Sequence, residues 1–289
     1  MKFFLPGNEG FVERLEVFGS DLTVVNAARV SFAKESHEMT KRDGGLIRYL
    51  ANHDHISPFF HPQIRFRLRM PIFVAREWFR HTIGFARNEV SRRYVDDRPA
   101  CWYPITGIRA RNENLKQGSA DHSIEGEVEM MAKWNEMQTQ VVDFYDYMLE
   151  KGVAPEVARG ILPQSMYTEF IETGSLYAYA RLCQLRLHPQ AQAEIRRYAD
   201  LIDKCLSSVF PVSWEALKAK WVVVDAPTVT AAVAAATTAV ATTTATTTTV
   251  ATETGSAPEA QPTVEQIEAD LQAKLAQMSL EGVGHVVGC

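Results

Sequence analysis

The sequence predicts an α/β fold of the α+β type, in which a sheet is combined with long helices. Residues 64–70 alternate between apolar and basic side chains, which is the period of a strand with one buried face. Residues Ser123–Lys151 repeat apolar side chains at steps of three and four, the period of a long amphipathic helix. With 46% hydrophobic and 22% charged residues, the 289-residue chain has the composition of a globular protein with a sizeable core.

The segments before the alternating strand predict a strand and two helices. Residues 11–18 have strand character. Asp21–Val30 predicts a short helix with Ser20 or Asp21 as its N-cap. Residues 46–51 continue as a second helix.

After the alternating strand, Pro71 suits the first turn of a new helix. Gly84 is expected to end that helix, and Arg87–Ser91 then forms an extended segment. Residues 106–122 are polar and aperiodic, which predicts a mobile loop. The apolar stripe of Ser123–Lys151 is interpreted as part of the core.

The last part of the folded region predicts further helices. One begins at residues 154–163, and Ser175 is expected to cap the next, over residues 175–186. Pro189–Leu206 forms a last core helix, and residues 214–221 close the domain.

Composition divides the chain at Trp221. We expect a catalytic domain over residues 1–221, a low-complexity Ala/Thr linker over 222–262, and a tail over 263–289. The tail carries a short amphipathic helix from Thr263 to Met278, which is either disordered or docks on a partner.

Charge and cysteine usage exclude several classes of protein. A net charge of −5 argues against a general binder of nucleic acid or membrane surfaces, so an anion site must be local. The four cysteines show no CxxC pairing, and no signal peptide or membrane-spanning run is expected. A reducing, cytoplasmic location is therefore predicted.

Three histidines, His53, His55 and His61, lie within nine positions. A turn at Pro58 separates them, and no acidic or cysteine residues complete a ligand set. We therefore predict no metal site. A capped turn between a helix and a strand is the other interpretation of this segment.

The stretch from Pro71 to Val95 concentrates basic and aromatic side chains. It contains five arginines: Arg76, Arg80, Arg87, Arg92 and Arg93. So many guanidinium groups repel one another unless an anion lies among them, and their planar fork suits phosphate and carboxylate. The alternative is a solvated basic face on an amphipathic helix.

The same stretch resembles the signature motif of the flavin-dependent thymidylate synthases (ThyX), an R-H-R followed after seven residues by S. The matching residues are Arg80, His81, Asn88, Glu89, Ser91, Arg93 and Tyr94. Two positions depart from the motif: Thr82 replaces the third residue, and Ser91 comes one residue later. His55, Ser57, Pro58 and His61 match the family's H-x-T-P-x-x-H segment, with Ser57 in place of threonine.

The C-terminal half of the domain resembles the same family without a gap. Arg159 matches a nucleotide-binding arginine, and Arg186 matches the arginine proposed to polarise the uracil ring at N3. Ser175 and Arg181 fall where the family has polar contacts to flavin. Taken alone, Arg186 has another interpretation, as a basic residue that stabilises the end of a helix.

The resemblance implies a ThyX-like fold with a mixed, mostly antiparallel sheet flanked by long helices. It implies the conversion of dUMP to dTMP, with 5,10-methylenetetrahydrofolate as carbon donor and FAD, reduced by NADPH, as hydride carrier. It also implies a homotetramer with active sites between subunits.

The implied site residues fall into three sets. The catalytic residue is Arg186. Those that contact dUMP are Glu77, Arg80, Glu89, Ser91, Arg92, Arg93, Arg159 and Arg186. Those that contact FAD are Ser57, Arg80, His81, Thr82, Asn88, Glu89, Ser175 and Arg181.

Two other functions remain open. A related flavoenzyme that installs another C5 group, such as hydroxymethyl, is suggested by the altered loop and by Glu77, where the family commonly has glutamine. A non-catalytic RNA-binding module is the third hypothesis. For Arg87 there are two expectations: it supplies the charge that Thr82 lacks, or it is merely exposed to solvent.

Overall fold

The structure, a computed structural model, describes residues 1–5, 9–113 and 118–221. The predicted linker 222–262 and the tail 263–289 with its amphipathic helix lie outside these residues. The elements below belong to the part of the chain that is described.

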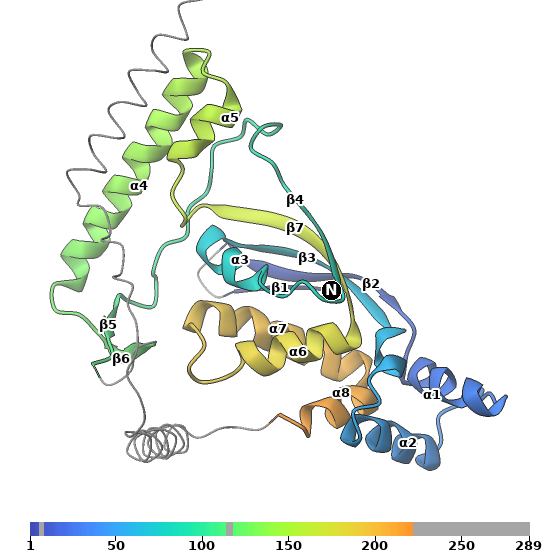
Figure 1. Cartoon of the computed structure of the whole chain (residues 1–289). Helices are drawn as coiled ribbons and strands as arrows, with labels where there is room; N and C mark the ends of the chain where they lie inside the picture. Colours follow the sequence, from blue (N-terminus) through green and yellow to red (C-terminus); the bar gives the residue numbers. More distant parts are fainter. Residues whose placement is uncertain (6–8, 114–117, 222–289) are drawn as a thin grey trace, which may run out of the picture. The chain divides into compact units, whose positions relative to one another are not determined.

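A five-stranded sheet forms the centre of the described region (Figure 1). Its strands are ordered β1 (Lys2–Phe4), β2 (Phe11–Phe18), β3 (Gln63–Pro71), β7 (Tyr167–Ser175) and β4 (Phe85–Glu89), and every neighbouring pair is antiparallel. Strands β5 (Arg109–Arg111) and β6 (Ser119–Ser123) form a separate two-stranded sheet. The expected combination of a mostly antiparallel sheet with helices is therefore confirmed.

Strand β3 follows the predicted alternation. The apolar side chains of Ile64, Phe66, Leu68 and Met70 are fully buried, and the arginines between them point away from the core. Strand β7 lies next to β3, with Leu68 opposite Phe170. This central pair carries much of the apolar core of the domain.

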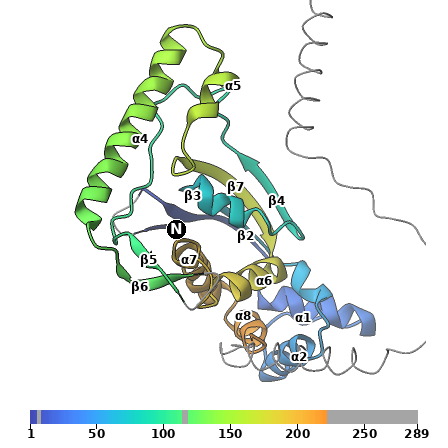
Figure 2. The same cartoon turned by 60° about the vertical axis from the view of Figure 1, so that its left-hand side comes forward.

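Helices surround the sheet. They are α1 (Asp21–Arg29), α2 (Lys41–Asn52), α3 (Ile72–Trp78), α4 (Glu127–Glu150), α5 (Pro155–Ala158), α6 (Leu176–Arg186), α7 (Ala193–Val209) and α8 (Pro211–Lys218), with the 3₁₀ turns η1 (Val30–Phe32), η2 (Ser57–Phe60) and η3 (Arg159–Ile161). Helices α6 and α7 lie side by side in both views (Figures 1 and 2), and α7 packs against β2 and α3. The apolar side of α7 completes the core.

The two residues expected as alternative caps of α1 have separate roles. Ser20 is the N-cap of α1, and its backbone N–H donates to Thr23 Oγ1 at 2.9 Å. Asp21 is buried, and its carboxylate accepts hydrogen bonds from the backbone N–H groups of Val212 and Ser213 at 3.0 and 2.8 Å. Asp21 therefore satisfies the first turn of α8.

The apolar stripe of α4 is not part of the core of this chain, so that prediction was wrong. Only Val142 and Tyr145 of α4 are buried, whereas Val128, Met137 and Phe144 are 83%, 56% and 47% exposed. The main contacts of α4 are with α5 and η3. Helical periodicity identifies an apolar face but not the surface that covers it.

The polar stretch 106–122, predicted as a mobile loop, contains the β5–β6 hairpin in its described parts. Arg109 lies opposite Ser123, and Arg111 opposite Ser119. Backbone hydrogen bonds hold such short polar strands without an apolar pattern, which is why periodicity missed them.

The histidine-rich segment lies at the end of α2 and in the turn that follows. His53 stacks on Tyr49 with ring centroids 4.1 Å apart, and its Nδ1 hydrogen bonds with the Tyr49 carbonyl at 2.9 Å. Among the described residues, no group of three His, Cys, Asp or Glu side chains is arranged to hold a metal ion.

Candidate active site

A sharp turn joins α3 to β4 and separates the two halves of the predicted motif. Gly84 has a φ of +80°, and a Cβ placed on it would lie 2.9 Å from the Cβ of Ala178. Only glycine fits this close approach with a positive φ. Helix α3 nevertheless ends at Trp78, six residues before Gly84, so the prediction that Gly84 ends this helix was wrong. Gly84 instead forms the turn that leads into β4, which begins at Phe85.

Three predicted site residues form one hydrogen-bonded cluster, which we call the Arg186 group: Glu77, His81 and Arg186. Arg186 ends α6, and its Nη1 pairs with the carboxylate of Glu77. Its Nη2 donates to the Glu77 carbonyl at 3.3 Å, and its Nε donates to His81 Nε2 at 2.9 Å. The guanidinium is thus fixed on three sides by residues at the end of α3.

His81 is neutral in this cluster. Burial, followed by the charges of Arg186, Arg87 and Arg181, lowers the pKa of His81 to about 4. Because Nε2 accepts the hydrogen bond from Arg186, the single ring proton lies on Nδ1. His81 is therefore a hydrogen-bond donor at Nδ1 near neutral pH.

A second set of predicted residues lines a cavity of about 730 Å³ beside β4 and β7, which we call the β4 cavity. These residues are Asn88, Glu89, Ser91, Arg92 and Arg159. Its lining is both polar and apolar, and it is enclosed partly by β7 and by the 3₁₀ turn that begins at Arg159.

Charges in the β4 cavity differ in how they are satisfied. Glu89 Oε1 accepts a hydrogen bond of 2.5 Å from Thr168 Oγ1, and Arg92 pairs with Asp97. Arg159 is exposed, and within the described part of the chain its side chain has no hydrogen-bond or ion-pair partner. Arg159 is therefore available to an incoming anion.

Two cavity residues were missed at the sequence level. Arg67 and Arg69 of β3 line the β4 cavity, where they pair with Glu169 and Glu9. The alternation of Arg67 and Arg69 with apolar residues showed that these arginines point away from the core. It did not show that the pairing of β7 with β3 and β4 brings the motif residues of β4 near them.

The remaining predicted residues lie outside both sets. Ser57, Arg80, Thr82 and Arg181 are exposed, as is Arg93, whose guanidinium donates to the Tyr94 hydroxyl at 3.0 Å. Ser175 is buried and, as predicted, caps α6: its Oγ accepts from the Ala178 N–H at 3.2 Å.

The expectation that Arg87 is merely exposed to solvent was wrong. Its side chain is only 14% exposed, and its Nε pairs with Glu172, which is fully buried on β7. The guanidinium also lies 4.7 Å from the ring centroid of Phe85 and 5.4 Å from that of Phe79. Arg87 is thus neither a solvated cation nor a free one.

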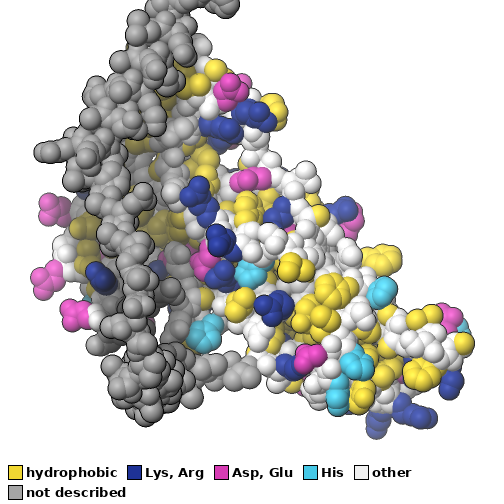
Figure 3. Space-filling model, in the orientation of Figure 1, with side chains coloured by type: hydrophobic (Ala, Val, Ile, Leu, Met, Phe, Trp, Pro, Cys, Tyr) yellow, Lys and Arg dark blue, Asp and Glu magenta, His cyan; other side chains and the backbone are white. Residues whose placement is uncertain are grey.

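Basic and acidic side chains intermingle on the face that carries this region. Figure 3 shows lysine and arginine side chains spread over the part of the surface near α5, α3 and α6, with acidic side chains among them. Ion pairs balance arginine charges in this region, as in Arg87 with Glu172 and Arg186 with Glu77.

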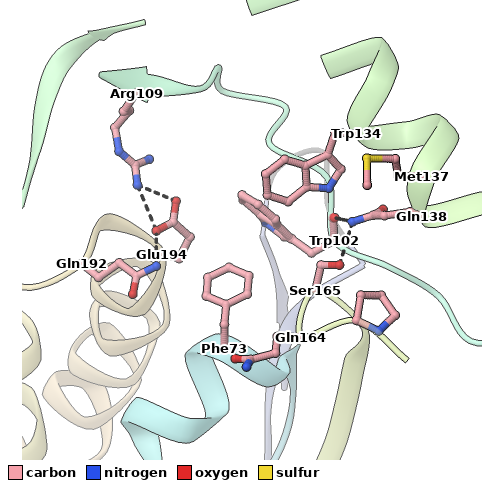
Figure 4. A pocket seen from close by; sticks show the side chains of 11 residues that line it. Phe73, Trp102, Arg109, Trp134, Met137, Gln138, Gln164, Ser165, Gln192 and Glu194 are labelled. Carbon is pink, nitrogen blue, oxygen red and sulfur yellow. Dashed lines mark hydrogen bonds and ion pairs between the residues drawn. The ribbon is translucent and has the colours of Figure 1, made fainter. Parts of the chain in front are cut away.

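A second cavity of about 590 Å³ lies between α4, the start of α7 and the turn before β7 (Figure 4). Trp102 forms edge contacts with Phe73 and Trp134, at centroid distances of 5.2 and 6.1 Å. On the other side, Arg109 Nη2 donates to both carboxylate oxygens of Glu194 at 2.8 and 3.0 Å.

The polar groups of this second cavity are engaged with one another. Gln138 Nε2 donates to Ser165 Oγ at 2.7 Å and to the Trp102 carbonyl at 3.0 Å. Burial acts to raise the pKa of Glu194, but the hydrogen bonds and charge of Arg109 outweigh it and hold that pKa below its usual value. Most of the surface that lines the cavity is apolar.

Comparisons with known proteins identify the family. A family profile described as "Thymidylate synthase complementing protein" matches residues 15–212. The chain belongs to the flavin-dependent thymidylate synthase family. The Thermus thermophilus enzyme of that name is 37% identical over 211 residues, which cover 73% of this chain and 76% of the enzyme. The Kosmotoga olearia enzyme is 38% identical, with 72% and 90% covered.

A solved structure of similar fold is the UMP/dUMP methylase PolB of Streptomyces cacaoi, with 5-bromo-dUMP bound. Its TM-score is 0.66 at 31% sequence identity, and the match covers 73% of this chain and 95% of PolB. Within the described residues of this family member, no helix is both long and apolar enough to cross a membrane.

Proposed function

We propose that this protein catalyses the reductive methylation of dUMP to dTMP, with FAD as the hydride carrier. The observation that carries the proposal is the joint position of Asn88, Glu89, Ser91 and Arg159, which match the family's sequence pattern and line one cavity together with Arg92. The named activity of the relatives supports the same reaction.

The β4 cavity is suited to a nucleotide. A nucleoside monophosphate carries a dianionic phosphate, which arginine binds through paired, charge-assisted hydrogen bonds. Arg159 is unpartnered within the described region, and Ser91 adds a hydroxyl. We assign phosphate and sugar contacts to these two residues with Arg80, Arg92 and Arg93, and we place Glu89 against the nucleotide as well.

Arg186 is the residue assigned to the uracil ring. A cation held rigidly near N3 and O4 stabilises negative charge that develops on the ring. Glu77 and His81 hold the guanidinium from three sides, so it does not need to reorganise during the reaction. Ser91 is assigned a hydrogen-bonding role, because a serine nucleophile requires an adjacent base.

The exposed residues around the turn fit a flavin. The flavin supplies the hydride, because no amino-acid side chain delivers one. His81 offers a neutral N–H donor, and Ser57, Arg80, Thr82 and Arg181 present exposed polar groups. Asn88 and Glu89 are assigned to the same cofactor from β4. Ser175 is assigned to the same cofactor: its Oγ caps α6 as an acceptor, and its O–H remains a donor.

The finer features of the family are part of the proposal. The carbon donor is 5,10-methylenetetrahydrofolate, the reductant is NADPH, and the location is cytoplasmic. The assembly is a homotetramer with active sites between subunits. The exposed apolar face of α4, with Val128, Met137 and Phe144, supports burial against other copies of the chain.

A second candidate function is methylation of UMP. PolB, at 31% identity over most of its length, is described as a methylase of both UMP and dUMP. The two substrates differ only at the 2′ position of the sugar. The other sequence-based alternatives, transfer of a hydroxymethyl group and non-catalytic RNA binding, predict different products or none.

One experiment separates these functions. Purified protein is examined for the absorption spectrum of bound flavin and then incubated with dUMP or UMP, methylenetetrahydrofolate and NADPH. Mass spectrometry of the product is expected to show a methyl group on dUMP. A hydroxymethyl product, exclusive use of UMP, or protein without flavin and turnover would contradict the proposal.

A further inference from the structure

The buried carboxylate of Glu172 contacts residues that neighbour, in the sequence, both the Arg186 group and the β4 cavity. The side chain of Glu172, on β7, is fully buried. Trp78 Nε1 donates to its two oxygens at 3.1 and 3.3 Å, and Arg87 Nε pairs with it from the other side. Glu172 therefore receives donors from both α3 and β4.

These donors are the sequence neighbours of site residues. Trp78 follows Glu77, which belongs to the Arg186 group. Arg87 precedes Asn88 and Glu89, which line the β4 cavity. Between them the chain passes through the exposed turn at Gly84.

The Glu172–Arg87 ion pair is held in one arrangement by its surroundings. Burial raises the pKa of Glu172, while the charge and hydrogen bond of Arg87 oppose that rise. Arg87 lies against Phe79 and Phe85, which leave its guanidinium little freedom. Apolar residues of similar volume often stabilise a core as well as a buried ion pair does, so such a pair is better suited to fixing geometry than to adding stability.

We infer that Glu172 and Arg87 are positioning residues that hold the Arg186 group and the β4 cavity in one active-site geometry. The inference rests on the proposed function, since it assigns both sets of residues to one nucleotide. Neither side chain needs to touch the substrate. Arg87 thus uses its charge inside the domain, and it does not replace the cation that Thr82 lacks.

The test compares single and double substitutions. Glu172→Gln and Arg87→Met each leave one buried charge without its partner and are expected to lower the melting temperature. The double variant Glu172→Leu/Arg87→Met removes both charges and is expected to regain most of that loss. We expect kcat/KM for dUMP, and dUMP affinity measured by calorimetry, to stay about ten- to a hundredfold below the parent.

The outcomes are distinct. A double variant with the parent's stability and also its kcat/KM and dUMP affinity would overturn the inference, because the pair would then be only structural. If the double variant does not fold, Arg87→Lys decides, since it keeps the charge but not the planar Nε contact: loss of affinity in a folded Arg87→Lys protein supports positioning, and unchanged affinity overturns it.

Two controls complete the design. The exposed pair Arg65–Glu16, between neighbouring strands of the same sheet, is replaced in Arg65→Met/Glu16→Gln, and we expect neither stability nor affinity to change. The parent protein is assayed beside the variants. A parent that neither binds nor converts dUMP would contradict the proposed function, which is a different result from a fully active double variant.

Discussion

The Arg186 group and the β4 cavity differ in how far the chain itself satisfies their charges. Arg186 makes three contacts with Glu77 and His81, and its charge is balanced within the domain. Arg159 has no partner among the described residues and faces the β4 cavity. A preorganised cation is suited to charge that develops during a reaction, whereas a free one is suited to an anion that arrives from solvent.

The largest effect is expected from Arg186→Ala. Loss of one preorganised charged contact lowers turnover by about 10²- to 10³-fold, while FAD stays bound. Turnover is measured by release of the C5 proton of dUMP, and the flavin by its absorption spectrum. Arg42→Ala, an exposed arginine on α2, serves as the control. Turnover like that of the control would remove Arg186 from the mechanism.

Arg159→Ala tests the β4 cavity. A charge-assisted contact to phosphate contributes roughly 1.5–3 kcal/mol, so dUMP affinity should fall by about ten- to a hundredfold. Because the Arg159 side chain makes no hydrogen bond or ion pair within the described residues, the melting temperature should stay the same. Arg92→Ala should lower both, since Arg92 also pairs with Asp97. Unchanged dUMP affinity in Arg159→Ala would show that the cavity does not bind the phosphate through this residue.

A smaller effect is expected from the neutral histidine of the Arg186 group. The pKa of His81 is lowered to about 4, from 6.5 in an unfolded chain. As pH falls below about 6.5, the unfolded state takes up the proton first, so stability is lost between about pH 6.5 and 4. With solvent screening of this partly exposed ring, the loss is on the order of 1 kcal/mol.

Urea unfolding of the parent and of His81→Gln at pH 7.5 and pH 5 measures this difference. The variant should lose less stability on acidification than the parent. Equal losses in the two proteins would mean that His81 does not titrate with a lowered pKa, and the assignment of its proton to Nδ1 would lose its support.

The smallest effect is expected from removal of residues 222–289, because every residue of both groups lies before Trp221. The shortened protein should fold, form the same oligomer and catalyse at the parent's rate. Light scattering and the turnover assay measure this. A monomeric or inactive product would mean that the tail contributes to assembly or to the site.

Residues whose environment follows the local pattern could be predicted from the sequence. The alternation of β3 and the cap Ser175 depend on neighbours within a few positions, and both were found as expected. The match of Arg186 to the family came from motif order, but its contacts with Glu77 and His81 did not, since these lie 109 and 105 positions away.

Residues whose environment depends on distant segments could not be predicted. Glu172 lies on the buried face of β7 with Phe170, while the apolar Ile171 points outward and is 44% exposed. The pattern of apolar residues alone would therefore place Glu172 on the solvent-exposed face of β7, whereas its side chain is buried. The stripe of α4 failed for the related reason that periodicity does not reveal which surface covers a helix.

The carboxylate of Asp21, which receives the N–H groups at the start of α8, also constrains the order in which the domain is completed. Its two hydrogen bonds join residues 191 and 192 positions apart. Closing so long a segment costs conformational entropy, and the contacts cannot form before residues 212 and 213 have been synthesised. During synthesis, Asp21 is therefore made early, but its carboxylate stays unpaired until nearly the whole described chain has been made. An unpaired Asp21 carboxylate thus indicates a domain in which α8 has not yet packed.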